Sequence, residues 1–347
     1  MTELKTRNKY KYALGALVVG LGTAGAAMAQ TAGEINISGY PGTIGGNFNK
    51  AFVDTFEGHD AIRYVESWDS ARFTQMQANR NNPRLDLVTF TDLTMPLAAG
   101  AGLLDALDES AVPNLADVQK AVRTEGDFGV PFTYGCQGIV YNAKYVKEPI
   151  TSWADLLRDD LKGHVSAPNV SYSMAFNILD ALSQLEGGSL KSPEAGMKLY
   201  RDIRTSGPGL WDQENVAVGW LKTGEIWATP YFSGNALGFL DDADLQDLRF
   251  VVPQEGAYYA PLGIAKVHGA PGDRKDIDAF INHVLSPEAQ AQMSKLGRTR
   301  PVNEHAEVSE AIAASCPLAS ELNKVDIGYL NENRSQIIDQ WNQSVNN

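Results

Sequence analysis

The chain has 347 residues, of which 44% are hydrophobic and 20% are charged, and its formal net charge is -13 at neutral pH. This length exceeds one ordinary hydrophobic core and predicts two domains. The acidic balance, without a long basic stretch, argues against nucleic-acid binding, and the two cysteines and five scattered histidines form no metal-binding motif.

The first 29 residues have the pattern of a secretory signal peptide. Four basic residues precede an apolar stretch over 12–26, and Ala27-Met28-Ala29 supplies a small-x-small cleavage pattern. The apolar stretch is shorter than the roughly 20 residues of a membrane span. We therefore expect a periplasmic mature protein that begins near Gln30. Its formal net charge would be about -16, because the removed segment carries four bases and one acid.

Strands alternate with helices in the first part of the mature chain. The pattern predicts strands at 34–38, 62–67 and 85–91, with helices over 47–57 and 68–81. This alternation is typical of parallel sheets flanked by helices.

Two long β-prone stretches, at 128–142 and 258–267, have the length of strands that leave one sheet and enter another. We expect shorter strands at 164–167, 225–232 and 248–253. Further helices are expected at 173–186, 192–206, 214–222, 273–285, 287–296, 304–314 and 326–345.

The glycine-rich stretch SGYPGTIGGNF, which follows the first strand, resembles a phosphate-binding loop only superficially. It lacks the Lys-Ser/Thr pair of a P-loop and the glycine spacing of a dinucleotide-binding loop. Nucleophile motifs are also missing, and Asp241, Asp242 and Asp244 are interpreted as a solvated turn. We therefore predict no enzyme activity and no cofactor.

Aromatic and small polar side chains gather at the expected strand ends. In an open α/β sheet these ends border the ligand-binding crevice. The pattern predicts an aromatic-lined binding pocket formed by Tyr40, Thr43, 89–92, Thr133, Tyr134, Tyr172, 231–233, Tyr258 and Tyr259.

Four stretches carry a family resemblance: LDLVTFTD…GLLDALDES, FGVPFTYGCQGIVYN, ITSWADLLRDDLKG and YYAPLGIAK…SPEAQAQMSKLGRTRPVN. They resemble the polyamine/iron-type periplasmic solute-binding proteins of ABC transporters, and most of all the spermidine/putrescine-binding branch. The resemblance implies a type II periplasmic-binding-protein fold, with two α/β lobes joined by a hinge of crossing strands. Lobe one would comprise 30–133 plus 261–303, and lobe two 134–260 plus 304–347. It also implies a monomer that delivers a small solute to an inner-membrane permease.

The same resemblance implies a set of ligand contacts. These are Tyr40, Gly42, Thr43, Phe90, Asp92, Tyr231, Phe232 and Tyr259, to which the aromatic pattern adds Tyr134 and Tyr172.

Departures from the family pattern restrict the ligand. The stretches APNVSYSM and YYAPLG lack the carboxylates with which polyamine binders neutralise ammonium groups, and burying an unpaired cation costs several kcal/mol. A long polyamine is therefore disfavoured. Asp92 would hold one amine of a small amine, amino-acid-like or opine-like solute, although a helix N-cap is an alternative role for this residue.

Other functions stay open at this point. Tyr258-Tyr259 looks like the tyrosine pair of ferric-binding relatives, and the amides of 42–47 could hold a phosphonate. A secreted enzyme on the same fold and a chemosensing role are further alternatives. Cys136 and Cys316 would both lie in lobe two, either bridged by a disulfide or as two buried thiols.

Overall fold

The computed structural model describes residues 34–346. The predicted signal peptide, 1–29, and the expected mature start at Gln30 lie outside the described residues. Within 34–346, none of the helices has the length and apolar character that a membrane span requires.

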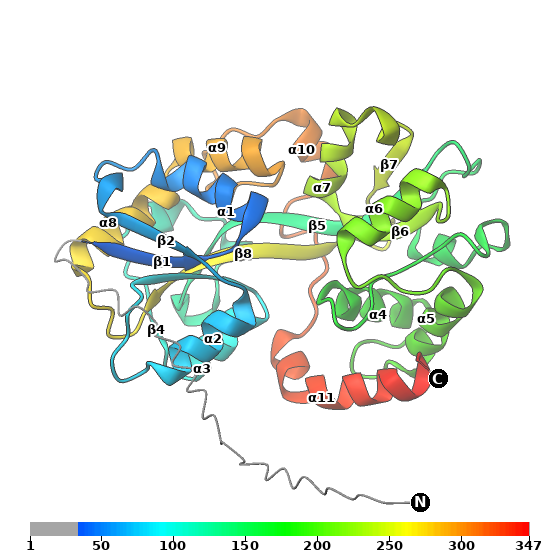
Figure 1. Cartoon of the computed structure of the whole chain (residues 1–347), viewed down its shortest axis with the longest axis horizontal. Coiled ribbons are helices and arrows are strands. Elements are labelled where there is room, and N and C mark those ends of the chain that lie inside the picture. Colours follow the sequence, from blue (N-terminus) through cyan, green and yellow to red (C-terminus); the bar gives the residue numbers. More distant parts are fainter. Residues whose placement is uncertain (1–33, 347) are drawn as a thin grey trace, which may run out of the picture. The chain divides into compact units, whose positions relative to one another are not determined.

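The first three strands form the parallel part of the sheet, as the alternating pattern predicted. Strand β1 pairs in parallel with both β2 and β3. Helices follow each of these strands and cover both faces (Figure 1). The elements are β1 (Ile35–Gly39), α1 (Gly42–Phe48), β2 (Ile62–Glu66), α2 (Asp69–Ala78), β3 (Leu87–Thr91), α3 (Thr94–Gly100) and β4 (Leu104–Asp105).

Two long strands, β5 (Val130–Asn142) and β8 (Tyr258–Val267), join this region to the rest of the molecule. They pair antiparallel with each other, and β8 also pairs antiparallel with β3. At its other end β5 pairs with β6 (Ala228–Phe232) and β7 (Leu248–Val251). The expectation of strands that leave one sheet for another is therefore corrected, because the eight strands within residues 34–346 belong to one mixed sheet. Six of them follow the order β2-β1-β3-β8-β5-β6, while β4 pairs with β8 and β7 pairs with β5. Figure 1 shows β5 and β8 side by side between the two groups of helices.

The remaining helices largely match the expected ranges. They are α4 (Met174–Leu185), α5 (Glu194–Ser206), α6 (Glu214–Thr223), α7 (Ser233–Gly238), α8 (Arg274–Val284), α9 (Pro287–Gly297), α10 (Glu310–Ser315) and α11 (Ile327–Ser344). Three expectations were wrong. The first helix begins at Gly42 rather than 47, the helix expected at 304–314 shrinks to α10, and the strand expected at 164–167 has a single bridge, from Val165 to Ala228.

The buried apolar side chains form separate cores, which mark the interiors of two lobes. In lobe one, one core lies on each face of the parallel strands: Ile37 belongs to the first and Phe90 to the second. The core of lobe two is built around α4, α5 and α11. Leu322 packs in a lobe-one core and Val325 in the lobe-two core. The chain therefore passes from one core to the other between these residues, while the expected lobe boundaries stay a prediction.

Cys136 and Cys316 are both buried and unbridged. Their thiols lie in contact, and burial raises the pKa of the Cys316 thiol. Both side chains belong to a lobe-one core together with Tyr134 and Tyr259. The disulfide considered from the sequence is not formed in this structure.

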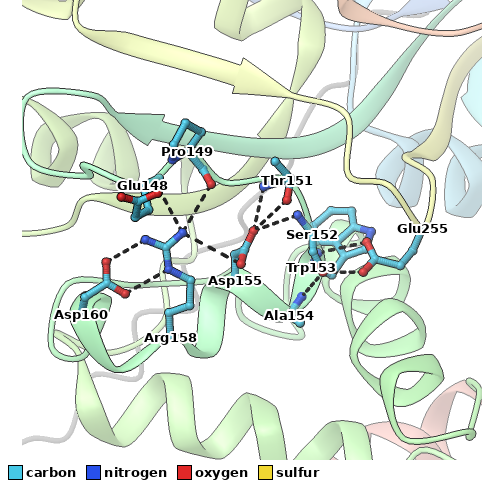
Figure 2. A network of polar contacts seen from close by, with 10 residues as sticks. All are labelled: Glu148, Pro149, Thr151, Ser152, Trp153, Ala154, Asp155, Arg158, Asp160 and Glu255. Atoms are coloured by element: carbon cyan, nitrogen blue, oxygen red, sulfur yellow. Dashed lines mark hydrogen bonds and ion pairs between the residues drawn. The ribbon is translucent and has the colours of Figure 1, made fainter.

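The stretch ITSWADLLRDDLKG, which carries much of the family resemblance, is hydrogen-bonded to the segment just before β8 (Figure 2). Ser152 caps a short 3-10 helix, and Asp155 accepts hydrogen bonds from the backbone of Thr151 and Ser152 at 2.7 and 3.0 Å. Ser152 and the backbone of Trp153 both donate to Glu255, just before β8. The motif therefore fixes the chain just before a crossing strand.

A buried ion pair ties β8 to α8. The ammonium of Lys266 donates to Asp278 at 2.7 Å, and the two side chains are only 3% and 12% exposed. A charge that is left without its partner in such a place is strongly destabilising, whereas an apolar pair of similar volume is often tolerated.

We predict that Lys266→Met lowers the free energy of unfolding by about 3–5 kcal/mol, because Asp278 is left buried without a counter-charge. The double variant Lys266→Met/Asp278→Leu should recover most of this loss. Chemical denaturation followed by tryptophan fluorescence measures both. A double variant as unstable as the single one would show that the charges themselves are not the cause.

Candidate functional site

The candidate site begins at the edge of lobe one where its three parallel strands end. The carboxyl ends of parallel strands lie at the same edge of a sheet, and ligands of α/β proteins bind there. Tyr40 follows β1, Trp68 follows β2 and Asp92 follows β3.

Two aromatic side chains form part of this edge. The ring of Tyr40 is almost completely buried, and Trp68, which is 61% exposed, meets it edge-on with a centroid distance of 6.2 Å. Burial, reinforced by the charge of Asp69, raises the pKa of the Tyr40 hydroxyl. This hydroxyl lies beside Asp69 without a hydrogen bond of good geometry. Trp68 was not among the predicted contacts, because its sequence position indicates only the start of a helix.

A buried guanidinium holds the three loops in place. Arg72 is 0% exposed, and its Nε donates to Ser38 Oγ at 3.1 Å and its Nη2 to the Ser67 carbonyl at 2.6 Å. A third bond reaches the carbonyl of Thr89. The guanidinium lies 5.1 Å from the ring centroid of Tyr40. Arg72 therefore connects the ends of β1, β2 and β3 through hydrogen bonds in the interior of lobe one.

Asp69 completes this support. One of its carboxylate oxygens accepts from the Thr91 backbone at 3.1 Å and from the Thr91 hydroxyl at 2.8 Å. Its other oxygen lies 3.4 Å from Arg72. These bonds fix the position of the next residue, Asp92.

Asp92 is the most perturbed carboxyl group at this edge. Its side chain is partly exposed yet closely surrounded by protein, and desolvation raises its pKa to about 7. The backbone amides of Asp92 and Leu93 and the Lys324 ammonium oppose this shift, whereas Asp69 adds to it. The N-cap position of α3 is Leu93, with no side-chain cap bond. Asp92 therefore accepts local amides without occupying the N-cap position itself.

The glycine-rich loop places exposed backbone at the same edge. Gly42 has a φ of +68°, with open space where a Cβ would project, and Thr43 beside it is exposed. Gly45 has a packing role, because a Cβ there would lie 2.1 Å from the Tyr40 carbonyl oxygen. Phe90 is 0% exposed and packs in the core beneath Arg72.

In lobe two, three predicted aromatics meet around a carboxylate that the sequence reading missed. The hydroxyl of Tyr172 donates to Glu214, and Asn235 Nδ2 donates to the other carboxylate oxygen at 2.5 Å. Tyr172 and Phe232 meet edge-on at 6.3 Å. Burial, followed by the charge of Glu214, raises the pKa of both Tyr172 and Tyr231.

Glu214 lies outside APNVSYSM and YYAPLG, the two stretches whose lack of carboxylates argued against a long polyamine, and it places an acid beside Tyr172. It is the first residue of α6, so its sequence position indicated only a favourable charge at a helix start. The bonds to Tyr172 and Asn235 come from residues 42 and 21 positions away. Such a long-range cluster has no local sequence signal.

The remaining predicted aromatics lie on the crossing strands. Tyr134 and Tyr259 are buried with ring centroids 5.5 Å apart. Tyr258 points into the other core, where its hydroxyl donates to Asp180 at 2.7 Å. Successive strand residues face opposite ways, so the structure does not bring the Tyr258 and Tyr259 hydroxyls together as a metal-binding pair.

Two pockets stand out in the part of the chain that the structure describes. One, of about 180 Å³, is lined by Asp92, Tyr259 and Lys324 among other residues. The other, of about 240 Å³, lies at the opposite end of lobe one, near Arg80 and His268. Among residues 34–346, no cluster of histidine, cysteine, aspartate or glutamate has the arrangement of a metal site.

Comparison with known proteins agrees with this architecture. A Salmonella typhimurium protein, provisionally named a 2-aminoethylphosphonate-binding periplasmic protein, is 23% identical over 246 residues, which cover 70% of this chain and 69% of the relative. A solved structure from Bordetella parapertussis, provisionally described as an extracellular solute-binding protein, has a TM-score of 0.80 at 24% identity and covers 90% of this chain and 98% of its own. An ABC transporter structure from Clostridium perfringens has a TM-score of 0.78 at 21% identity and covers 90% and 100%.

The solved structures confirm the expected two-lobe periplasmic-binding fold. The profile of one protein family matches residues 47–317, which is most of the chain. The protein belongs to the family of bacterial extracellular solute-binding proteins.

Proposed function

We propose that this protein is the periplasmic binding component of an ABC importer and that its solute carries an ammonium group. The observation that carries the proposal is a carboxylate beside aromatic rings in each lobe: Asp92 near Tyr40 in lobe one, and Glu214 near Tyr172 in lobe two. Closure of the lobes around a hinge would bring both acids to one ligand.

The environment of Asp92 favours the binding of a cation. A desolvated carboxylate has a raised pKa until an opposite charge arrives, and pairing then favours its ionised form. At the same edge of lobe one, the exposed ring of Trp68 offers a face to an ammonium group, and such a cation–π contact contributes about 0.5–2 kcal/mol. Recognition would therefore combine one ion pair with aromatic contact.

Hydrogen bonds hold Glu214 where it could bind an ammonium group from the side of lobe two. Tyr172 and Asn235 each donate one hydrogen bond to it, which fixes both oxygens while leaving lone pairs free for a ligand. With a carboxylate in each lobe, each amine of a short diamine would have an acidic partner. The proposal therefore includes short diamines as well as monoamines.

Known relatives support an amine without selecting one. The name of the Salmonella relative includes an aminoalkyl compound. Solved structures of the same fold are named for GABA, for spermidine and putrescine, and for ferric ion. In this chain, burial raises the pKa of the tyrosines near the site, which disfavours the phenolate ligands that ferric iron would need.

Capture without turnover is part of the proposal. Asp92 accepts hydrogen bonds from the backbone amides of Asp92 and Leu93, and Glu214 accepts them from Tyr172 and Asn235, so the described partners of both carboxylates suit binding of a cation. A thermal-shift screen of the mature protein with ethanolamine, putrescine and 2-aminoethylphosphonate would identify a bound amine. Mass spectrometry after denaturation should return that amine unchanged, and a modified product would contradict the binding role.

Amine affinity should depend on pH through Asp92. Its pKa of about 7 means that the carboxyl is protonated, and unable to pair with an ammonium, as the pH falls below neutrality. We expect the dissociation constant of a bound amine to rise by about tenfold per pH unit below pH 6 and to level off above pH 8. Titration calorimetry from pH 5 to 9 measures this dependence. A flat profile across this range would exclude Asp92 as the partner of the amine.

Asp92→Asn should stabilise the ligand-free protein while it weakens amine binding. A carboxyl whose pKa is raised on folding binds its proton more tightly in the folded state, so it lowers stability as the pH rises from about 4 to 7. We expect the Tm at pH 8 to rise by at least about 2 °C, with no difference near pH 4. Asp54→Asn, at an exposed position, is the matched control. A lower Tm at pH 8 would indicate a structural role for the carboxylate.

Glu214→Gln should weaken amine binding by about tenfold or more, because the amide keeps the shape but removes the charge. Exposed Glu225 provides a control with the same charge change, Glu225→Gln. Calorimetry with the amine found in the screen compares the two. Equal affinities for both variants would remove Glu214 from the ligand site.

A further inference from the structure

The pocket of about 180 Å³ next to Asp92 contains a second charged group that none of the predicted contacts includes. This is Lys324, which the C-terminal segment supplies as it passes between the two cores, after Leu322 and before Val325. The pocket is therefore lined both by residues at the end of β3 in lobe one and by the segment that leads into α11.

Lys324 is held at the pocket by contacts with uncharged groups. Its ammonium donates to the carbonyl of Ala121 at 2.5 Å and lies 4.6 Å from the ring centroid of Tyr259. Burial lowers the pKa of Lys324, and the charge of Asp92 opposes that shift. Among the described residues, no carboxylate lies within 4.0 Å of this ammonium. An ammonium has three donors, so donors remain for a ligand.

The other cation at this pocket is already neutralised. Arg123 pairs with Asp127 at 2.6 Å and with Glu109 at 2.9 Å. Glu125 also lines the pocket. Lys324 is therefore the lining cation that has no carboxylate partner within ion-pair distance among the described residues.

The rest of the pocket is mainly apolar. Its walls include Phe90, Met95, Pro131, Pro261 and Ile327. An acid and an ammonium that share an apolar recess match a small molecule with opposite charges at its two ends. A simple amine would satisfy Asp92 and leave Lys324 without a partner.

We propose that Lys324 binds the anionic end of the solute, a carboxylate or phosphonate whose ammonium end pairs with Asp92. This assignment rests on the proposed amine-binding function and narrows it to short zwitterions with a separated amine and acid. Lys324 is then a specificity residue, because it distinguishes such zwitterions from amines that lack the acid.

Matched ligands separate this assignment from amine binding as such. Ethanolamine, β-alanine and 2-aminoethylphosphonate share an aminoethyl group and differ in the group at the other end. Calorimetry on the mature protein should show tighter binding of the two zwitterions than of ethanolamine. Lys324→Met should weaken the zwitterions by about tenfold or more and leave ethanolamine within about twofold. Lys324→Arg, which keeps the charge, should retain most of the zwitterion affinity.

Lys198→Met is the control, because Lys198 is exposed on α5, and Tm values verify that each variant is folded. Equal losses for ethanolamine and the zwitterions in Lys324→Met would overturn the assignment, as would no loss for either. Both results leave the amine-binding proposal intact. If none of the three ligands binds the wild-type protein, the amine-binding proposal fails and the role of Lys324 fails with it.

Discussion

The pairing of β5 with β8 is the constraint on which the rest of the structure depends. These two strands run antiparallel from Val130 and Ile264 to Gln137 and Tyr258, and the one sheet continues through them. Alternate side chains of this pair enter different cores: Tyr259 packs in a lobe-one core and Tyr258 in the lobe-two core. The same pair of strands therefore contributes side chains to both interiors.

At the edge of lobe one where β1, β2 and β3 end, buried hydrogen bonds hold the loop that carries Asp92. The buried guanidinium of Arg72 links three strand ends through its hydrogen bonds, and Asp69 accepts a hydrogen bond from the backbone at the end of β3. The cost of desolvation then falls on Asp92, one of two carboxyl groups that line the pocket. In the proposed function, a bound ammonium group would offset this cost.

Local patterns in the sequence predicted most of the fold. The parallel β1–β3 unit follows from alternation, and the long crossing strands follow from the unbroken β-prone stretches at 128–142 and 258–267. The single mixed sheet could not be predicted in this way, because the pairing of β5 with β8 joins residues more than a hundred positions apart. The stretch ITSWADLLRDDLKG was one of four that carried the family resemblance, and its Ser152 and Asp155 bond to backbone amides and to Glu255.

The candidate site was less accessible from sequence. Tyr40, Asp92, Tyr172 and Phe232 were named because they follow expected strands or match a family pattern, and the structure brings Tyr172 and Phe232 into contact. Trp68, Glu214 and Lys324 were missed because each occupies a position with an ordinary local explanation: Trp68 and Glu214 lie at helix starts, and Lys324 is exposed on an irregular segment. Their importance comes from partners distant in the chain, which periodicity does not encode.

We propose that carboxylates from both lobes hold one ammonium group. The most direct test is a crystal structure of the mature protein with the amine that most stabilises it. We expect the ammonium nitrogen within hydrogen-bond distance of both Asp92 and Glu214, with the lobes closed around it. An ammonium nitrogen that contacts only one of these carboxylates, or neither, would refute the proposal.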